Sequence, residues 1–127
     1  MFLRDVIIAL PEKTVSSETI SQWTGLGVDF IKNKIGIENR HFLGADETVL
    51  ELTVKACEKL FERHGSLKPE NIDIVVLITQ NPDYKIPHTS ALIQDALSLP
   101  ENTACFDINL GCSGFVYGLS IIKAFMV

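Results

Sequence analysis

Residues 104–119 read ACFDINLGCSGFVYGL, the most informative stretch of the chain. An extended segment, residues 103–109, leads into a tight turn with Cys112 between Gly111 and Gly114, and an apolar helix is expected to follow. A helix start favours negative charge through its free N–H groups and its dipole, and the thiolate is the nucleophilic form of cysteine. The glycines leave room for a substrate carbonyl, whose oxyanion the backbone N–H groups could stabilise. We therefore interpret Cys112 as an acyl-accepting nucleophile.

Composition narrows the possible classes of function. The chain has 127 residues, which suits one domain or one half of a larger one. Its net charge of −5 and its lack of a basic run argue against nucleic acid as the main partner. Three cysteines without paired spacing fit a reducing, cytoplasmic setting, and they are too scattered among the histidines for a metal site. Residues 1–11 lack the long apolar core of a signal peptide.

The last expected helix, residues 112–127, is apolar almost all round, with Lys123 as its only charge. It is shorter than the roughly 20 residues that a membrane span needs. A helix that is apolar on every side is normally buried in a large protein. We expect either that the chain is the N-terminal part of a longer protein or that a second chain covers this helix.

Periodicity and turn residues predict an alternation of strands and helices along the chain. The expected elements are a strand at 6–10, a helix from Ser16 or Ser17 to about Thr24, a short helix at 28–34, a helix at 47–64, a strand at 72–79 and a helix at 88–97. Cys57 falls on the apolar face of the helix at 47–64, so we interpret it as core filling. Glu51 and Lys55 are expected to pair on the outer face. Strand, helix and strand at this spacing indicate a parallel sheet covered by helices.

Residues 107–119 resemble the nucleophile segment of the β-ketoacyl-acyl carrier protein synthase III family, condensing enzymes of the thiolase fold. Cys112 falls on the family's active-site cysteine. Residues 36–41 match a Gly-Ile-x-x-Arg-His element of the family, in which we expect Arg40 to tie loop carbonyls together and His41 to belong to the scaffold. A cysteine between a strand and a helix is often only a small buried apolar residue, and these two matches favour the nucleophile instead.

The resemblance implies an α/β, thiolase-like fold. Residues 1–127 would form one thiolase-like N-terminal domain, the N-terminal half of a five-layered α-β-α-β-α sandwich. The family's catalytic histidine and asparagine lie in the second half, which this chain does not include. Family members act as homodimers, in which the residue at Ile86 projects toward the partner's acyl pocket.

The resemblance also implies the chemistry of the whole protein. The family cysteine takes an acyl group from acyl-coenzyme A and condenses it with malonyl-acyl carrier protein, with loss of carbon dioxide and without a bound prosthetic group. The expected partners are therefore acyl carrier protein, acyl-coenzyme A and a second copy of the chain, with no nucleic acid and no membrane. Phe30 and Lys34 stand where the family often has tryptophan and arginine beside coenzyme A, although lysine lacks the planar fork of arginine. Gly111 stands where many members have alanine.

Three alternatives remain open at this point. The chain could belong to a non-catalytic partner subunit of a condensing enzyme. It could belong to a thiolase-fold acyltransferase of secondary metabolism that does not decarboxylate. A thiol redox protein using Cys105 and Cys112 is disfavoured, because the sequence has no Cys-x-x-Cys motif.

Overall fold

The computed structural model describes residues 2–126. The chain divides into two compact units. Unit 1 comprises residues 2–9 together with 48–126, and unit 2 comprises residues 10–47. Each unit has its own sheet, and each is described by itself.

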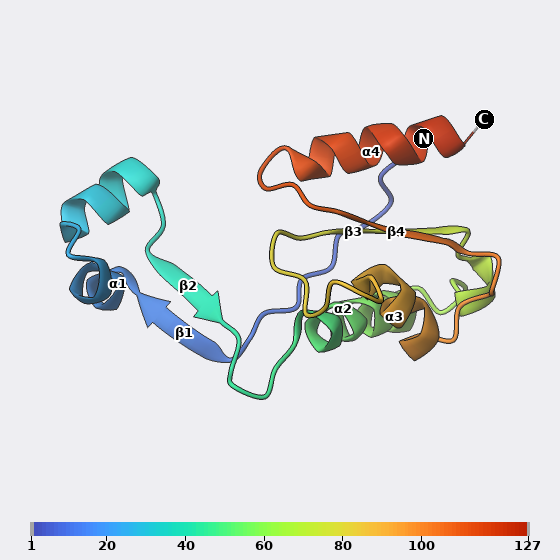
Figure 1. The fold of residues 1–127 in the computed structure, drawn as a ribbon, viewed down its shortest axis with the longest axis horizontal. Helices are drawn as coiled ribbons and strands as arrows, with labels where there is room; N and C mark the ends of the chain where they lie inside the picture. The colour runs from blue at the N-terminus through green and yellow to red at the C-terminus, as the bar shows by residue number, and fades with distance from the viewer. Residues whose placement is uncertain (1, 127) are drawn as a thin grey trace. The chain divides into compact units, whose positions relative to one another are not determined.

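Unit 1 is built on a two-stranded parallel sheet with helices on both faces (Figure 1). Strand β3, Ile74–Ile78, pairs with β4, Ala104–Ile108, in a register that runs from Ile74 opposite Ala104 to Ile78 opposite Ile108. Helices α2, Val49–Arg63, and α3, Thr89–Ala96, lie on one face, and α4, Gly114–Phe125, lies on the other. The predicted parallel sheet and its covering helices are confirmed.

Sequence explains why these elements form. Every residue of β3 is apolar and most are β-branched, as expected for a strand covered on both faces. Helix α2 begins with a capping box, because the Thr48 side chain accepts from the Glu51 N–H while the Glu51 carboxylate accepts from the Thr48 N–H at 3.0 Å. The predicted pair of Glu51 with Lys55 was wrong. No such ion pair occurs within residues 2–126, since the Glu51 carboxylate turns back to the helix start.

Helix α4 presents two different faces. Gly114 and Gly118 are buried where the helix crosses the sheet. The outward face exposes large apolar side chains, namely Phe115, Val116, Tyr117, Phe125 and Met126. The expectation of a helix apolar all round is therefore met, but only one face of it is covered within the part of the chain that the structure describes.

Unit 2 is a small antiparallel ribbon with two short helical segments. Strands β1, Lys13–Ser16, and β2, Asn39–Phe42, flank α1, Ser17–Thr24, and η1, a π-helical turn at Phe30–Ile35. Ser16 caps α1, as predicted, and Gly25 ends it with φ of 72°. The short helix predicted at 28–34 is present, and its residues 30–35 are π-helical.

Two further predictions in the first 47 residues were wrong. Residues 6–10 form no strand, because a strand needs a paired neighbour and none lies beside them within residues 2–126. Arg40 donates no side-chain hydrogen bond to the described residues, and its Nη1 is buried without a partner. His41 does belong to the scaffold, since its Nδ1–H donates to the Pro11 carbonyl at 2.7 Å.

None of the helices in residues 2–126 combines the length and apolarity that crossing a membrane would require.

Candidate active site

Cys112 lies in the turn that joins β4 to α4. The turn is closed by a hydrogen bond of 2.9 Å from the Gly114 N–H to the Gly111 carbonyl, and α4 begins at Gly114. The cysteine therefore precedes the helix, whereas the sequence predicted a helix starting at Cys112. Its side chain is exposed, and its thiol is free. A reagent or substrate can reach this sulfur from solvent.

The start of α4 is open beside this thiol. Ser113 is the N-cap residue, but its side chain makes no capping hydrogen bond. The N–H groups of the first helical turn that have no partner inside the helix are thus available to an oxyanion. This arrangement fits an acyl-transfer site, in which negative charge develops on a carbonyl oxygen next to the attacking sulfur.

Gly111 and Gly114, the two glycines around Cys112, each leave space for a different side chain of the protein. A Cβ on Gly114 would lie 2.4 Å from Cγ2 of Ile78, so this glycine lets α4 pack closely against β3. A Cβ on Gly111 would lie 3.0 Å from Oε1 of Gln80, so this glycine makes room for a glutamine side chain. The sequence suggested that both glycines leave space for a substrate carbonyl. In the structure, the space beside each glycine, where a Cβ would lie, is taken by a side chain of the protein itself.

The other two cysteines are poorer nucleophiles. Both are partly buried and free. Burial raises the pKa of the Cys57 thiol, and the Glu58 carboxylate adds to this effect. Burial also raises the pKa of the Cys105 thiol, with a further contribution from Asp107. Because the thiolate is the reactive form, the two buried thiols are disfavoured relative to an exposed one.

Two aspartates anchor the loop between β3 and α3. Asp83 accepts from the Val49 and Leu50 N–H groups at 2.9 and 2.8 Å, which ties the loop to the start of α2. Asp107 accepts from the Thr89 and Ser90 N–H groups at 2.8 and 2.9 Å, at the start of α3. Sequence analysis missed both carboxylates. For Asp107 a signal was available. His88, at the start of the predicted helix, is a poor capping residue, so the first N–H groups of that helix need a hydrogen-bond acceptor from elsewhere in the chain.

Burial by itself would raise the pKa of the Asp107 carboxyl, but hydrogen bonds from Ser90 and Thr89 outweigh burial and hold the pKa below its ordinary value. The carboxylate form is therefore the one that the fold stabilises at neutral pH.

No histidine is hydrogen-bonded to Cys112 within residues 2–126. His88 Nε2 donates to the Cys105 carbonyl at 3.2 Å, and His64 Nε2 lies 2.6 Å from Asp5 Oδ2. Both rings are thus engaged elsewhere. None of the three histidines is therefore placed for the catalytic role that the resemblance gives to a histidine of the family's second half.

Phe30 and Lys34, the expected coenzyme A contacts, both belong to unit 2. Both side chains are exposed, with half of the Phe30 surface open to solvent. They lie on the π-turn η1, whereas the sequence placed them on an ordinary helix. Exposure is a condition for ligand contact, and their binding role stays a prediction.

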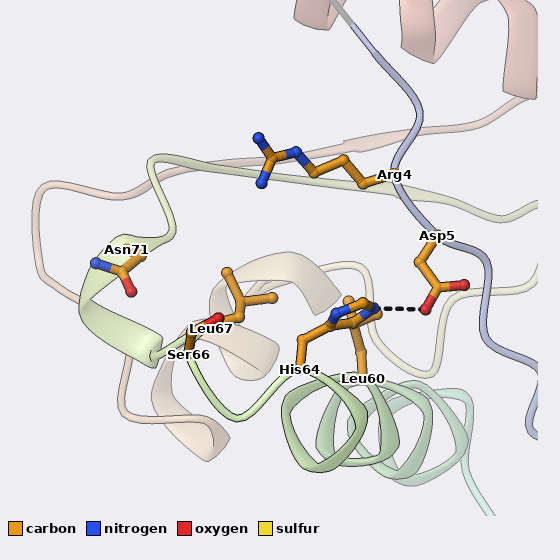
Figure 2. Close-up of a pocket in the computed structure, with 7 residues that line it drawn as sticks. All are labelled: Arg4, Asp5, Leu60, His64, Ser66, Leu67 and Asn71. Atoms are coloured by element: carbon orange, nitrogen blue, oxygen red, sulfur yellow. Dashed lines mark hydrogen bonds and ion pairs between the residues drawn. The ribbon is translucent and has the colours of Figure 1, made fainter.

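Unit 1 also contains a cavity that does not include Cys112 (Figure 2). This cavity of about 450 Å³ is lined by Arg4, Asp5, Leu60, His64, Ser66, Leu67 and Asn71. The hydrogen bond from His64 is the largest of several contacts that hold the pKa of the Asp5 carboxyl below its ordinary value. The cavity holds no cysteine, and its imidazole is already paired with a carboxylate, so it offers no nucleophile for acyl transfer.

No family model matches the chain. A relative from Lactiplantibacillus plantarum, β-ketoacyl-acyl-carrier-protein synthase III 2, is 34% identical over 118 residues, which are 93% of this chain and 35% of the relative. The chain thus spans about a third of the length of the curated relatives that it matches.

Solved structures agree with the sequence relatives. The crystal structure of 3-oxoacyl-acyl-carrier-protein synthase III from Aquifex aeolicus superposes with a TM-score of 0.81 at 28% identity, over 93% of this chain and 37% of that one. A tetronic acid condensing enzyme superposes with a TM-score of 0.75, also at 28% identity, over 93% of this chain and 37% of that one. These similarities confirm the predicted fold class, in which the layers of unit 1 belong to the N-terminal half of a thiolase-like sandwich.

Proposed function

Since the chain belongs to the β-ketoacyl-acyl carrier protein synthase III-like proteins of the thiolase-like superfamily, we propose that the whole protein is a condensing acyltransferase with Cys112 as its nucleophile. The observation that carries this proposal is the exposed Cys112 thiol in the turn before the uncapped start of α4. Relatives that match about nine-tenths of this chain are named as synthases of this type, which supports the reaction class.

The chemistry would proceed in two steps at this cysteine. The Cys112 thiolate attacks the thioester carbonyl of the acyl donor, the oxyanion is stabilised by N–H groups at the start of α4, and the donor thiolate leaves. Loss of carbon dioxide from a malonyl thioester then produces a carbon nucleophile, which attacks the acyl group and releases the Cys112 thiolate. The resemblance assigns the stabilisation of that carbon nucleophile to a histidine and an asparagine outside this chain.

Substrates, partners and location are part of the same proposal. Acyl-coenzyme A is the donor, malonyl-acyl carrier protein is the acceptor, and Phe30 and Lys34 contact the donor. The protein acts in the cytoplasm as a homodimer in which Ile86 contributes to the interface. Its side chain, 90% exposed, supports this role, since a large apolar side chain is rarely left so open without a partner.

A second candidate function has a specific observation in its favour. The likeness to a tetronic acid condensing enzyme fits an acyltransferase of secondary metabolism. Such a protein would still load an acyl group on Cys112. It would differ in the second step, in which the acyl group is passed on without decarboxylation.

Acyl loading tests the first step. The whole protein is incubated with acetyl- or butyryl-coenzyme A and its intact mass is measured. The expected result is a gain of one acyl group, located on the peptide that contains Cys112, and its loss in Cys112→Ser. Cys57→Ser and Cys105→Ser are the matched controls and should retain the label. A label that persists in Cys112→Ser, or that maps to another cysteine, would contradict the assignment.

Release of carbon dioxide separates the two candidates. Malonyl-acyl carrier protein is added to the loaded enzyme, and both carbon dioxide and the product thioester are measured. A β-ketoacyl product with equimolar carbon dioxide supports the synthase. Transfer of the acyl group without carbon dioxide supports the second candidate. A protein that is monomeric in gel filtration with light scattering would contradict the proposed homodimer.

A further inference from the structure

Gln80 is the side chain nearest to the position that a Cβ on Gly111 would take, in the turn that holds Cys112. It lies two residues after the end of β3, and between them the Thr79 N–H continues the pairing with the Ile108 carbonyl at 3.2 Å. Because parallel strands end at the same edge, this residue and the turn after β4 meet there. A Cβ on residue 111 would lie 3.0 Å from Gln80 Oε1, 3.4 Å from Cδ and 3.6 Å from Nε2.

The carboxamide of Gln80 covers the residue directly before the nucleophile. Its side chain is exposed, and it makes no hydrogen bond to another group in residues 2–126. One acceptor and two donor N–H groups are therefore free at this place. Gly111 does not adopt a positive φ, so backbone conformation does not require glycine here, and the nearest group that a Cβ would meet is the flexible end of the glutamine.

Cys112 follows Gly111 directly, so an acyl group on its sulfur would start from the residue next to this carboxamide. A plain alkyl chain that covers the carboxamide removes it from water without giving a hydrogen bond in return, which is unfavourable. An acyl group with a hydroxyl or keto oxygen near the thioester can supply that bond. A site that offers a hydrogen-bonding group to the substrate discriminates against the analogue that lacks the matching oxygen.

We propose that Gln80 is a specificity residue of the acyl site, which favours acyl groups with a hydrogen-bonding oxygen close to the thioester, and that Gly111 makes room for it. The inference rests on the proposed function, because it assumes that Cys112 carries the acyl group. It adds a substrate class to that function, namely short oxygenated acyl groups in preference to saturated ones of equal length.

The test compares two acyl donors that differ by one hydroxyl. Butyryl- and 3-hydroxybutyryl-coenzyme A are each given to the whole protein, and the rate of Cys112 acylation is followed by intact mass. The wild-type protein should load the hydroxylated group faster. Gln80→Met keeps the side-chain length without the hydrogen-bonding atoms, and it should reduce the ratio of the two rates by about three- to tenfold, the range for one neutral hydrogen bond.

Gly111→Ala is the second variant, and it leaves the glutamine in the sequence. Its methyl group would displace the flexible end of Gln80, so the rate ratio should fall as in Gln80→Met while the thermal unfolding temperature changes little. The double variant should show no further fall, because both changes remove the same contact. Asn81→Ser alters the neighbouring exposed polar side chain, and it should keep the wild-type ratio.

The outcomes separate this inference from the function on which it rests. If no donor labels Cys112 in the wild-type protein, both are overturned. If Cys112 is labelled but Gln80→Met keeps the wild-type ratio, only the role of Gln80 is overturned. Additive effects of Gln80→Met and Gly111→Ala would overturn the pairing of these two residues.

Discussion

The side chain of Ile78 occupies the space in which a Cβ on Gly114 would lie. Its Cγ2 would be 2.4 Å from that atom, and its Cδ1 would be 2.7 Å from a Cβ on Gly118, one turn further along α4. Ile78 therefore fits between two glycines of the helix. This contact sets how closely α4 approaches β3, and with it the position of the turn that carries Cys112.

Gly114→Ala should destabilise the protein. The added methyl group has to displace Ile78 or the helix, and such overpacking typically costs about 1–3 kcal/mol. Denaturant unfolding followed by circular dichroism measures the loss. Acylation of Cys112 should also slow, because the turn moves together with the helix start. An unfolding midpoint equal to the wild-type value would contradict the contact.

Gly118→Ala offers a matched comparison within the same contact. Its new methyl group meets Cδ1 of Ile78, whereas that of Gly114→Ala meets Cγ2. Ile78→Val removes Cδ1 and retains a methyl group at the Cγ2 position. It should therefore rescue Gly118→Ala, where alanine also brings about 0.8–1.0 kcal/mol of helix propensity, and it should leave Gly114→Ala destabilised. Equal rescue of both variants would contradict the assignment of Cδ1 to the Gly118 contact and of Cγ2 to the Gly114 contact.

Local patterns were sufficient to predict most elements of unit 1. Apolar β-branched runs gave β3, and the periodicity of residues 47–64 gave α2 within two residues at each end. Residues 6–10 show the limit, since their apolar run met the criteria for a strand but a strand also depends on a neighbour in space. The π-turn η1 shows another limit, because the pattern of residues 28–34 does not distinguish it from a short helix.

Asp107 should make stability depend on pH in the acid range. Its folded-state pKa is held below the ordinary value, so the stabilisation is present above that ordinary value, near 4, and is lost as pH falls through the lowered pKa. Urea unfolding between pH 6 and pH 2 measures the slope. Asp107→Asn should lower stability at pH 6 by about 1–2 kcal/mol, because an amide offers one acceptor oxygen where the carboxylate offers two.

The pH dependence of this variant supplies the control. Asp107→Asn does not titrate, so its unfolding free energy should lose the part of the acid slope that belongs to this carboxyl. Asp83→Asn removes an acceptor from the start of α2 in the same way, and it leaves Asp107 in place. A slope in Asp107→Asn identical to that of the wild-type protein would contradict the role of Asp107.

Thiol reactivity should single out Cys112 among the three cysteines. It is exposed, whereas burial raises the pKa of both Cys57 and Cys105. Iodoacetamide at pH 7.5 should therefore modify Cys112 first, with the other two reacting mainly after unfolding. Peptide mapping over time measures the order. Modification of Cys57 or Cys105 at the rate of Cys112 in the folded protein would contradict the burial pattern.

Sequence located the nucleophile but not its surroundings. The Gly-Cys-Ser-Gly run marked Cys112, and its exposure in the structure agrees with that role. The contact of Gln80 with Gly111 joins residues 31 positions apart, and only the parallel pairing of β3 with β4 brings them together. The same holds for Asp107 and α3. Such contacts depend on tertiary geometry, which no local spacing encodes.

The outward face of α4 should make residues 1–127 poorly soluble when they are expressed alone. Phe115, Val116, Tyr117, Phe125 and Met126 are all exposed there. Each large apolar side chain forgoes about 1.5–3 kcal/mol while it stays in water, and together they approach the roughly 5–15 kcal/mol that stabilises a typical domain. Apolar patches this large usually mark a surface that another layer or chain covers.

Dye binding measures this exposed surface directly. Residues 1–127 should bind a fluorescent apolar dye strongly, and the whole protein should bind it weakly. A variant with Val116→Glu and Phe125→Lys places charges on the outward face without touching Gly114 or Gly118, so it should raise the solubility of residues 1–127 and reduce dye binding. A soluble, monomeric wild-type fragment that binds no dye would contradict the prediction, because its α4 face would then need no cover.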